Sequence, residues 1–216
     1  MRATHREALG LCLGASSIGL VRVRAEASGV TVVRAVNLPH GGDPPGALED
    51  LLASEPGWRG LPACATGRKL RNIVTFPSIS EPEAVELAAA HELGPAPARA
   101  AVLCAGGETF MAYGLDTNAR VREIRSGGKC ASGTGEFLAQ QLGRMGLGVG
   151  ELSSMDALAE RFAVSGRCSV FCKSDCTHAL NKGAPKQSVV AGLGAMMAGK
   201  CLELLHGLER EALLLV

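Results

Sequence analysis

The feature that most constrains the fold of this chain is an internal repeat. The segment Val102–Gly106 can be laid on Leu11–Gly14 so that Cys104 matches Cys12, an offset of 92 residues (104 minus 12). In both copies an apolar run ends in glycine and polar residues, and two further strand-like runs follow across short turns. Self-similarity at a fixed offset is typical of duplicated architectures. We therefore expect two halves of the same design.

The first copy predicts strands, a short helix and a capped second helix. Ser80 precedes Glu83 by three residues, which is the spacing of a capping box at a helix start, and an apolar stripe of Val85, Leu87 and Ala88 follows. A Gly/Pro-rich loop is expected over 39–46. The expected strands are 8–14, 18–24, 30–36 and 61–66, and the expected short helix is 47–52.

The second copy begins at residue 99 and predicts the same hairpin, followed by more helix. A turn is expected at 116–118. The expected strands are 102–106, 107–115, 121–125 and 213–216, and the expected helices start near 137, 151, 169 and 187, the last three ending at 162, 180 and 208. The sequence thus predicts an α/β chain with subdomains at 1–98 and 99–216.

Composition excludes several classes of function. The chain has 216 residues with 22 basic and 21 acidic side chains, so no global field attracts nucleic acid or an anionic membrane. One Trp and one Tyr leave few platforms for stacking bases. No apolar run is long enough to span a bilayer, and no N-terminal run qualifies as a signal peptide. Eight cysteines without a secretory signal indicate reduced thiols, hence a cytoplasmic protein in which some of them bind metal.

Two cysteines stand at predicted helix starts. The stretch 126–137 combines Cys130 with several glycines and an abrupt predicted helix start. The stretch 166–176 has the same pattern of a glycine, a basic residue, a cysteine and a predicted helix, with Cys168 lying 38 residues after Cys130 (168 minus 130). Backbone N–H groups and the positive dipole end of a helix favour a thiolate at such a position. Both residues are therefore candidate metal ligands.

The other cysteines admit a second interpretation. Cys172 and Cys176 would join Cys130 and Cys168 in an intrachain four-cysteine zinc or iron-sulfur site. Against it, Cys168, Cys172 and Cys176 spread over about 12 Å of a straight helix, too far for one metal. Cys64 and Cys201 are expected to be small buried hydrophobes. A solvated or dimer-facing rim is expected at Lys173, Asp175 and His178.

Lys129–Leu138 and Cys168–Phe171, with their separation, resemble the two cysteine motifs of the activases of 2-hydroxyacyl-CoA dehydratases and benzoyl-CoA reductases, the BadF/BadG/BcrA/BcrD ATPase family. The resemblance implies a homodimer that shares one [4Fe-4S] cluster, to which each subunit gives two cysteines, here Cys130 and Cys168. ATP would drive electron transfer to an acyl-CoA dehydratase or reductase component, in anaerobic metabolism.

The implied fold is the duplicated, ribonuclease H-like fold of acetate and sugar kinases, heat-shock chaperone ATPases and actin. There, two hairpin turns grip the phosphates of ATP between the halves. The residues that match these positions are Gly14, Ser16 and Ser17 in the first turn, Gly106, Gly107 and Thr109 in the second, and Gly133, Thr134 and Gly135 after Cys130. Family members continue with an adenosine-binding Gly-Gly turn and a closing helix, so we expect the second half to be truncated.

The Mg²⁺ positions depart from the family pattern. Cys12 and Cys104 stand where the family has aspartates. A thiol is a soft, poor Mg²⁺ partner, so the replacements are expected to weaken ATP hydrolysis more than binding. Glu108 is the candidate that replaces the lost carboxylate; the other interpretation is a solvated hairpin residue.

The motifs together predict a coupling mechanism, and two alternatives to it stay open. Nucleotide would rotate the halves, and the helices that begin at Cys130 and Cys168 would transmit the motion. One alternative is a degenerate actin-like module that holds a cluster or zinc as a structural or redox-sensing element without ATP turnover. The other is a small-molecule kinase of the same fold, against which Cys104 speaks because it removes a carboxylate base.

Overall fold

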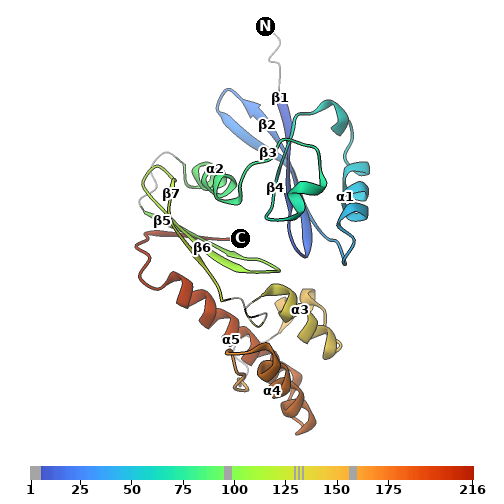
Figure 1. The fold of residues 1–216 in the computed structure, drawn as a ribbon, viewed down its shortest axis with the longest axis vertical. Helices are drawn as coiled ribbons and strands as arrows, with labels where there is room; N and C mark the ends of the chain where they lie inside the picture. The colour runs from blue at the N-terminus through green and yellow to red at the C-terminus, as the bar shows by residue number, and fades with distance from the viewer. Residues whose placement is uncertain (1–5, 95–98, 129, 131, 133, 156–159) are drawn as a thin grey trace. The chain divides into compact units, whose positions relative to one another are not determined.

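The computed structural model describes residues 6–94, 99–128, 130, 132, 134–155 and 160–216. They form two compact units: one within Met1–Pro97 together with Asn118–Arg120, the other within Ala98–Thr117 and Val121–Val216. The predicted boundary between 98 and 99 touches the undescribed segment 95–98 and stays a prediction. Each unit is described by itself (Figure 1).

The first unit is built on a four-stranded sheet of order β3-β2-β1-β4. Its strands are β1 (Arg6–Leu13), β2 (Ser17–Glu26), β3 (Gly29–Pro39) and β4 (Ala63–Thr66). β1 is antiparallel to β2 and parallel to β4, with Leu11 opposite Leu20 and Ala65. The inward side chains of β1 are the leucines at 9, 11 and 13, all buried, which is the period-2 pattern of a half-buried strand.

Helix α1 (Pro44–Ala53) covers one face of this sheet (Figure 1). Asp43 caps it by accepting a hydrogen bond from the Gly46 N–H at 3.1 Å. Three leucines of α1 pack on the buried leucines of β1 and on Ile18 and Leu20 of β2. Beyond the helix lie two 3₁₀ turns, η1 (Trp58–Gly60) and η2 (Leu70–Ile73).

Glu55, just past α1, is a buried carboxylate with two arginine partners from the sheet. It is 2% exposed and accepts hydrogen bonds from Arg22 on β2 at 2.7 Å and from Arg34 on β3 at 2.5 Å. Burial of a charge without such partners lowers the free energy of unfolding by roughly several kcal/mol. The cluster therefore fixes the end of α1 over β2 and β3.

Helix α2 (Glu81–Leu93) begins as the sequence predicts. The Ser80 hydroxyl accepts from the Glu83 N–H, and the Glu83 carboxylate accepts from the Ser80 N–H at 2.9 Å, completing the capping box. The predicted apolar stripe is wrong in its position. Leu87 is 64% exposed and Ala88 is also exposed, whereas Ala89 is buried.

The second unit repeats the sheet, with order β7-β6-β5-β8. Its strands are β5 (Ala100–Ala105), β6 (Phe110–Leu115), β7 (Val121–Ser126) and β8 (Ala212–Leu215). β5 is antiparallel to β6 and parallel to β8, as β1 is to β2 and β4. Cys12 lies opposite Gly19 and Cys104 opposite Met111, so the offset of 92 holds for both partners.

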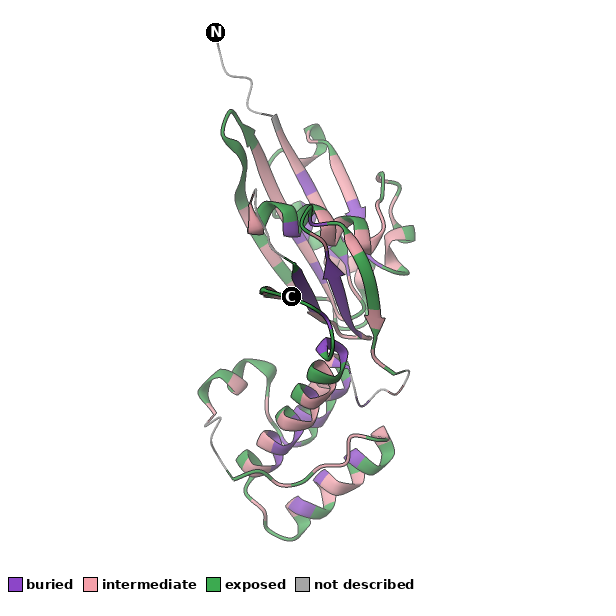
Figure 2. Ribbon diagram, turned by 90° about the vertical axis from the view of Figure 1, so that its left-hand side faces the viewer, coloured by how far each residue is buried: buried purple, intermediate pink, exposed green. Residues whose placement is uncertain are grey.

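Three helices form a second core in this unit: α3 (Gly135–Arg144), α4 (Ser169–Asn181) and α5 (Lys186–Leu205). Figure 2 shows buried positions along the facing sides of these helices. Contrary to the expectation that no apolar run is long enough to span a bilayer, α5, among the described helices, is long and apolar enough to do so by length and composition. Its buried residues Val189, Val190 and Leu193 belong to the core with α3 and α4, which fits the core helix of a soluble protein.

The predicted helix over 151–162 is wrong where the structure describes it. A 3₁₀ helix, η4, covers Val149–Ser154, and residues 160–166 have no regular structure. The hydroxyls of Ser153 and Ser154 bond back to the carbonyls of Gly150 and Glu151, which competes with α-helix formation. Residues 156–159 lie outside the described chain.

Candidate nucleotide turns and paired-cysteine site

The first turn, Gly14–Ser17, is a tight hairpin that requires glycine. The Gly14 N–H donates to the Ser17 carbonyl at 3.0 Å, and a Cβ on Gly14 would lie 2.9 Å from that oxygen. The Ser16 carbonyl accepts from the His40 N–H at 3.1 Å, which ties the turn to the end of β3. The predicted residues Gly14, Ser16 and Ser17 are thus together on one fixed turn.

Cys12 lies two residues before this turn. It has an exposed surface, yet the surrounding protein still desolvates the thiol and raises its pKa, and the Glu81 carboxylate adds repulsion. Neutral thiol is therefore the form at neutral pH. A neutral thiol is a poor ligand for Mg²⁺, so the residue does not take over the role of an aspartate.

The second turn, Gly106–Thr109, has the same shape. A Cβ on Gly106 would lie 3.0 Å from the Thr109 carbonyl oxygen, as one on Gly14 would from Ser17. Glu108 is exposed on this turn, while Gly107 and Thr109 are half-buried. The structure therefore brings Gly106, Gly107 and Thr109 together, with Glu108 beside them.

The second turn differs from the first in being fastened to a helix. The N–H groups of Gly135 and Glu136, in the first turn of α3, donate to the carbonyls of Gly106 and Gly107, each at 3.1 Å. Two of the orphan donors of the α3 N-terminus are satisfied in this way. A displacement of this turn must therefore either move the start of α3 or break these two hydrogen bonds.

Thr134 is the N-cap of α3. Its side-chain oxygen accepts from the Phe137 N–H at 3.2 Å, and the residue is buried. Its role in the described structure is therefore to start the helix. Gly133, predicted beside it, lies outside the described residues.

The two cysteine loops meet at Cys130. Its sulfur lies 3.3 Å from the Ser132 hydroxyl oxygen, and that hydroxyl donates to the Gly166 carbonyl at 3.2 Å. Hydrogen bonds from the side chain and backbone of Ser132 lower the pKa of Cys130 to about 7 from 9.0. Burial opposes this shift, and the backbone and hydroxyl of Ser169 add to it. The two motifs are therefore in contact through Ser132 and Gly166, whereas the meeting of the Cys130 and Cys168 sulfurs at one surface stays a prediction.

Cys168 is the N-cap residue of α4, immediately before Ser169. It is half-buried, and its side chain makes no capping hydrogen bond. Its own carbonyl accepts the first helical bond, from the Cys172 N–H at 2.9 Å. The thiol of Cys168 is therefore not engaged in starting the helix that it precedes.

Cys172 and Cys176 belong to the core instead. They are 0% and 4% exposed and pack with Phe137, Leu142 and Val189. Hydrogen bonding to Cys176 and burial raise the pKa of Cys172 far above its ordinary value, so it is a neutral thiol. Among the described residues no group of three or more His, Cys, Asp or Glu side chains is arranged to hold a metal. The intrachain four-cysteine alternative is therefore not supported.

The predicted rim is only partly exposed. Lys173 and His178 are exposed, but Asp175 accepts a hydrogen bond from the Ser165 N–H at 2.9 Å. This bond fixes the loop before Cys168 to α4, so Asp175 has a structural role. Cys64 and Cys201 are half-buried rather than buried, and burial raises the pKa of Cys201.

The donor set fits a cluster shared by two copies. A [4Fe-4S] cluster takes four thiolates, and each chain offers two half-buried cysteines, Cys130 on the loop before α3 and Cys168 at the N-cap of α4. The turns fit a phosphate because glycine lets the backbone approach closely. The Mg²⁺ part fits less well, since Cys12 and Cys104 offer sulfur instead of oxygen.

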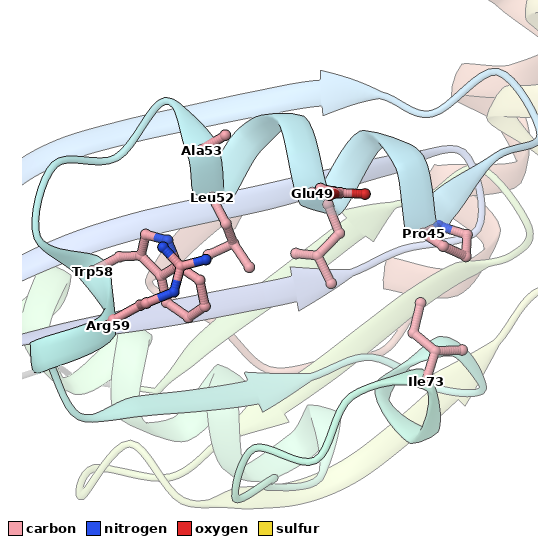
Figure 3. A pocket seen from close by; sticks show the side chains of 8 residues that line it. Pro45, Glu49, Leu52, Ala53, Trp58, Arg59 and Ile73 are labelled. Atoms are coloured by element: carbon pink, nitrogen blue, oxygen red, sulfur yellow. The ribbon is translucent and has the colours of Figure 1, made fainter.

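A separate cavity of about 520 Å³ lies in the first unit, under α1. Figure 3 shows Trp58, Arg59 and Leu52 at one end and Ile73 across from α1. The Arg59 guanidinium lies 4.8 Å from the centre of the Trp58 ring. Of the residues predicted to form the nucleotide and cysteine sites, none lines this cavity.

A sheet that recurs with the same strand order and the same hairpin turn defines the class as an actin-like ATPase fold. The match to a family model narrows the class further. Residues 84–215 match the BadF/BadG/BcrA/BcrD ATPase family, which is more than half of the chain. The chain therefore belongs to that family, and the resemblance drawn from the cysteine motifs is confirmed.

Known relatives agree with this assignment. The uncharacterized protein YjiL of Escherichia coli is 30% identical over 125 residues, 56% of this chain and 49% of that protein. The activator of lactoyl-CoA dehydratase of Anaerotignum propionicum is 26% identical over 121 residues, 55% of this chain and 47% of that protein. The chain thus matches about half the length of these curated relatives.

A solved structure confirms the predicted fold class. The activator of 2-hydroxyisocaproyl-CoA dehydratase from Clostridium difficile, solved with bound ADPNP, superposes with a TM-score of 0.75 at 23% identity. The alignment covers 97% of this chain and 80% of that one. At this identity the likeness establishes the fold.

Sequence reasoning missed two features of the site. It did not single out Ser132, whose only signal was its position two residues after Cys130 inside a glycine-rich loop. It also proposed Gly135 as part of a phosphate cradle, whereas its N–H is occupied by the Gly106 carbonyl. Both depend on contacts between loops that lie far apart in the sequence.

Proposed function

We propose that this chain is an iron-sulfur activator of the ATPase type, which passes electrons to a 2-hydroxyacyl-CoA dehydratase or to a partner similar to benzoyl-CoA reductase. The observation that carries the proposal is the meeting of the two cysteine loops at Cys130, Ser132 and Gly166. Membership of an activator-containing ATPase family agrees with it.

The cluster would be held by Cys130 and Cys168 of each of two copies. The lowered pKa of Cys130 makes the thiolate accessible near neutral pH, which is the form that binds iron. A bound [4Fe-4S] cluster supplies a one-electron carrier. Cys168 immediately precedes α4, where the helix dipole stabilises negative charge, and Cys130 lies on the loop five residues before α3 begins.

Nucleotide would act on this site through the second turn. In the proposal, the glycines of the two turns receive phosphate oxygens, and Glu108 replaces a lost carboxylate toward Mg²⁺. The bonds from Gly135 and Glu136 to the turn carry its displacement to α3, which follows the Cys130 loop. By linkage, nucleotide shifts the cysteine site only as far as it binds two conformations unequally.

The proposed setting follows from the same features. In the proposal the protein is a cytoplasmic homodimer of anaerobic metabolism, with an acyl-CoA dehydratase or reductase component as its partner. The balanced charge supports the part of the proposal that excludes nucleic acid and an anionic membrane as partners.

The test is electron transfer under anaerobic conditions. The full chain, reconstituted with iron and sulfide and reduced with dithionite, is mixed with a purified 2-hydroxyacyl-CoA dehydratase, with ATP and, separately, without nucleotide. The proposal predicts ATP-dependent reduction of the dehydratase, followed by its spectrum. Reduction at the same rate without ATP, or no reduction by a loaded protein, would contradict it.

A second candidate is favoured by Cys12 and Cys104, which replace both expected aspartates. In this form the chain is an actin-like module that holds a cluster or zinc as a structural or redox-sensing element without ATP turnover. The discriminating measurement is ATP hydrolysis together with thermal unfolding with and without Mg-ATP. Absence of turnover and of a shift in melting temperature selects the second candidate.

A further inference from the structure

Ser132 is a fully buried residue in the loop between β7 and α3. It is 0% exposed, whereas Gly128 is exposed and Cys130 is half-buried. Burial of a hydroxyl without partners costs free energy, so a buried serine is expected to have specific contacts. Its contacts lie on two different loops.

One contact is the sulfur of Cys130 at 3.3 Å, and the other is the Gly166 carbonyl oxygen at 3.2 Å. A hydroxyl has one proton and two acceptor lone pairs. With its proton on the Gly166 carbonyl, it accepts from Cys130 when that sulfur carries a proton. Ser132 therefore joins the Cys130 sulfur to the backbone two residues before Cys168.

Besides Ser132, the backbone and hydroxyl of Ser169 hydrogen-bond to Cys130 across the two loops, and each loop also has an anchor on an element of its own. The first is tied at its start to β6, by the Gly127 N–H that donates to the Phe110 carbonyl at 2.8 Å. The second is tied to α4, by the Ser165 N–H that donates to Asp175. These anchors fix each loop to its own support, and Ser132 links one loop to the other.

We propose that Ser132 is a positioning residue of the paired-cysteine site, which holds the Cys130 sulfur in register with the loop that carries Cys168. When the sulfur is a metal-bound thiolate, the single hydroxyl proton of Ser132 turns from the Gly166 carbonyl to the sulfur and donates a hydrogen bond to it. The second part rests on the proposed function, whereas the first concerns the metal-free chain.

Two consequences follow. Removal of the hydroxyl leaves the Gly166 carbonyl without its donor, so the loop before Cys168 opens more readily. Hydrogen bonds to cluster sulfurs raise the reduction potential of iron-sulfur clusters. The loss of such a bond therefore shifts the midpoint potential to more negative values.

The experiment compares the full chain with Ser132→Ala, Ser132→Thr and the control Ser174→Ala, which removes a half-buried hydroxyl from α4. In the metal-free proteins, amide hydrogen exchange is measured for residues 165–168. In proteins reconstituted with iron and sulfide, iron per chain and the midpoint potential are measured by redox titration.

We expect Ser132→Ala to speed exchange at residues 165–168, to lower the iron content and to shift the remaining cluster to a more negative potential. Ser132→Thr and Ser174→Ala should keep wild-type values. Wild-type exchange in Ser132→Ala overturns the loop-joining role. A Ser132→Ala potential equal to that of the wild type, or equal shifts in the Ala and Thr variants, overturns the donor role. Failure of the wild-type chain to bind iron sinks the proposed function but leaves the exchange result to decide the loop-joining role.

Discussion

Two pairs of cysteines in the second unit have different environments, although Cys168 of the first pair immediately precedes the helix that carries the second pair. Cys130 and Cys168 are half-buried at loop ends, and hydrogen bonds from Ser132 lower the pKa of Cys130 to about 7. Cys172 and Cys176, on the next two turns of α4, are buried, and the hydrogen bond between them raises the pKa of Cys172 and lowers that of Cys176. Position relative to the helix start, rather than residue type, thus separates candidate ligands from core residues.

The largest expected difference between the pairs is in iron binding. Cys130→Ala and Cys168→Ala should lose nearly all iron after anaerobic reconstitution, because each removes half of the ligands that one chain provides. Cys172→Ala, the matched control on α4, should retain wild-type iron per chain. Equal iron in Cys130→Ala and the wild type would remove the basis of the comparison.

The next difference is in thiol reactivity of the metal-free protein. With its pKa lowered to about 7, Cys130 is half thiolate at neutral pH, and its alkylation rate should rise through pH 7 and level off. Burial raises the pKa of Cys201, so this thiol should be alkylated at least roughly tenfold more slowly than Cys130 at pH 7. Iodoacetamide labelling followed by peptide mass spectrometry measures both. A Cys130 midpoint near 9 would contradict the assigned hydrogen bonds.

The lowered pKa of Cys130 also makes the stability of the folded protein depend on pH. Because the folded pKa of Cys130 lies below the unfolded value, its contribution is complete above the unfolded pKa and is lost as pH falls through about 7. The free energy of unfolding, measured with urea, should therefore increase less between pH 6 and pH 9 in Cys130→Ala than in the wild type. The same gain in both proteins would refute the linkage.

A smaller effect is expected where the chain segment before Cys168 packs against α5. Residues 160–166 cross α5 at Gly192, where a Cβ would overlap the Phe162 carbonyl oxygen. Gly192→Ala should destabilise folding by about 1–3 kcal/mol through overpacking. Gly194→Ala, on the same helix and with open space around it, is the control and should not destabilise. Chemical denaturation measures both, and equal stabilities would contradict the packing.

The smallest effect concerns the helix after Cys130. Thr134→Ala removes the N-cap of α3 and should cost about 1 kcal/mol of stability. Thr177→Ala, at a hydroxyl that bonds back to Lys173 inside α4, serves as its control and should cost less. A larger loss in the control, measured by thermal unfolding, would argue against the capping role.

The repeat and the cysteine motifs were predictable from the sequence because they depend on local pattern. The offset that aligns Cys104 with Cys12 predicted that the two halves repeat the same hairpin. The spacing of Ser80 and Glu83 predicted where α2 begins. The helix expected over 151–162 failed because local hydroxyl bonds and the crossing at Gly192 override its pattern.

The environment of each cysteine was only partly predictable. Helix spacing alone argued against joining Cys172 and Cys176 to the site, but their burial depends on α3 and α5, which come from other parts of the chain. Likewise, Ser132 becomes informative only when Gly166 is placed beside it. Tertiary contacts of this kind carry no periodic signal.

The most direct test of the central claim is the native mass and iron content of the anaerobically reconstituted wild-type chain. We expect a dimer with four irons, hence two per chain, and iron-free protein when Cys130 is replaced by alanine. An iron-loaded monomer, or a dimer that keeps its four irons in Cys130→Ala, would contradict it.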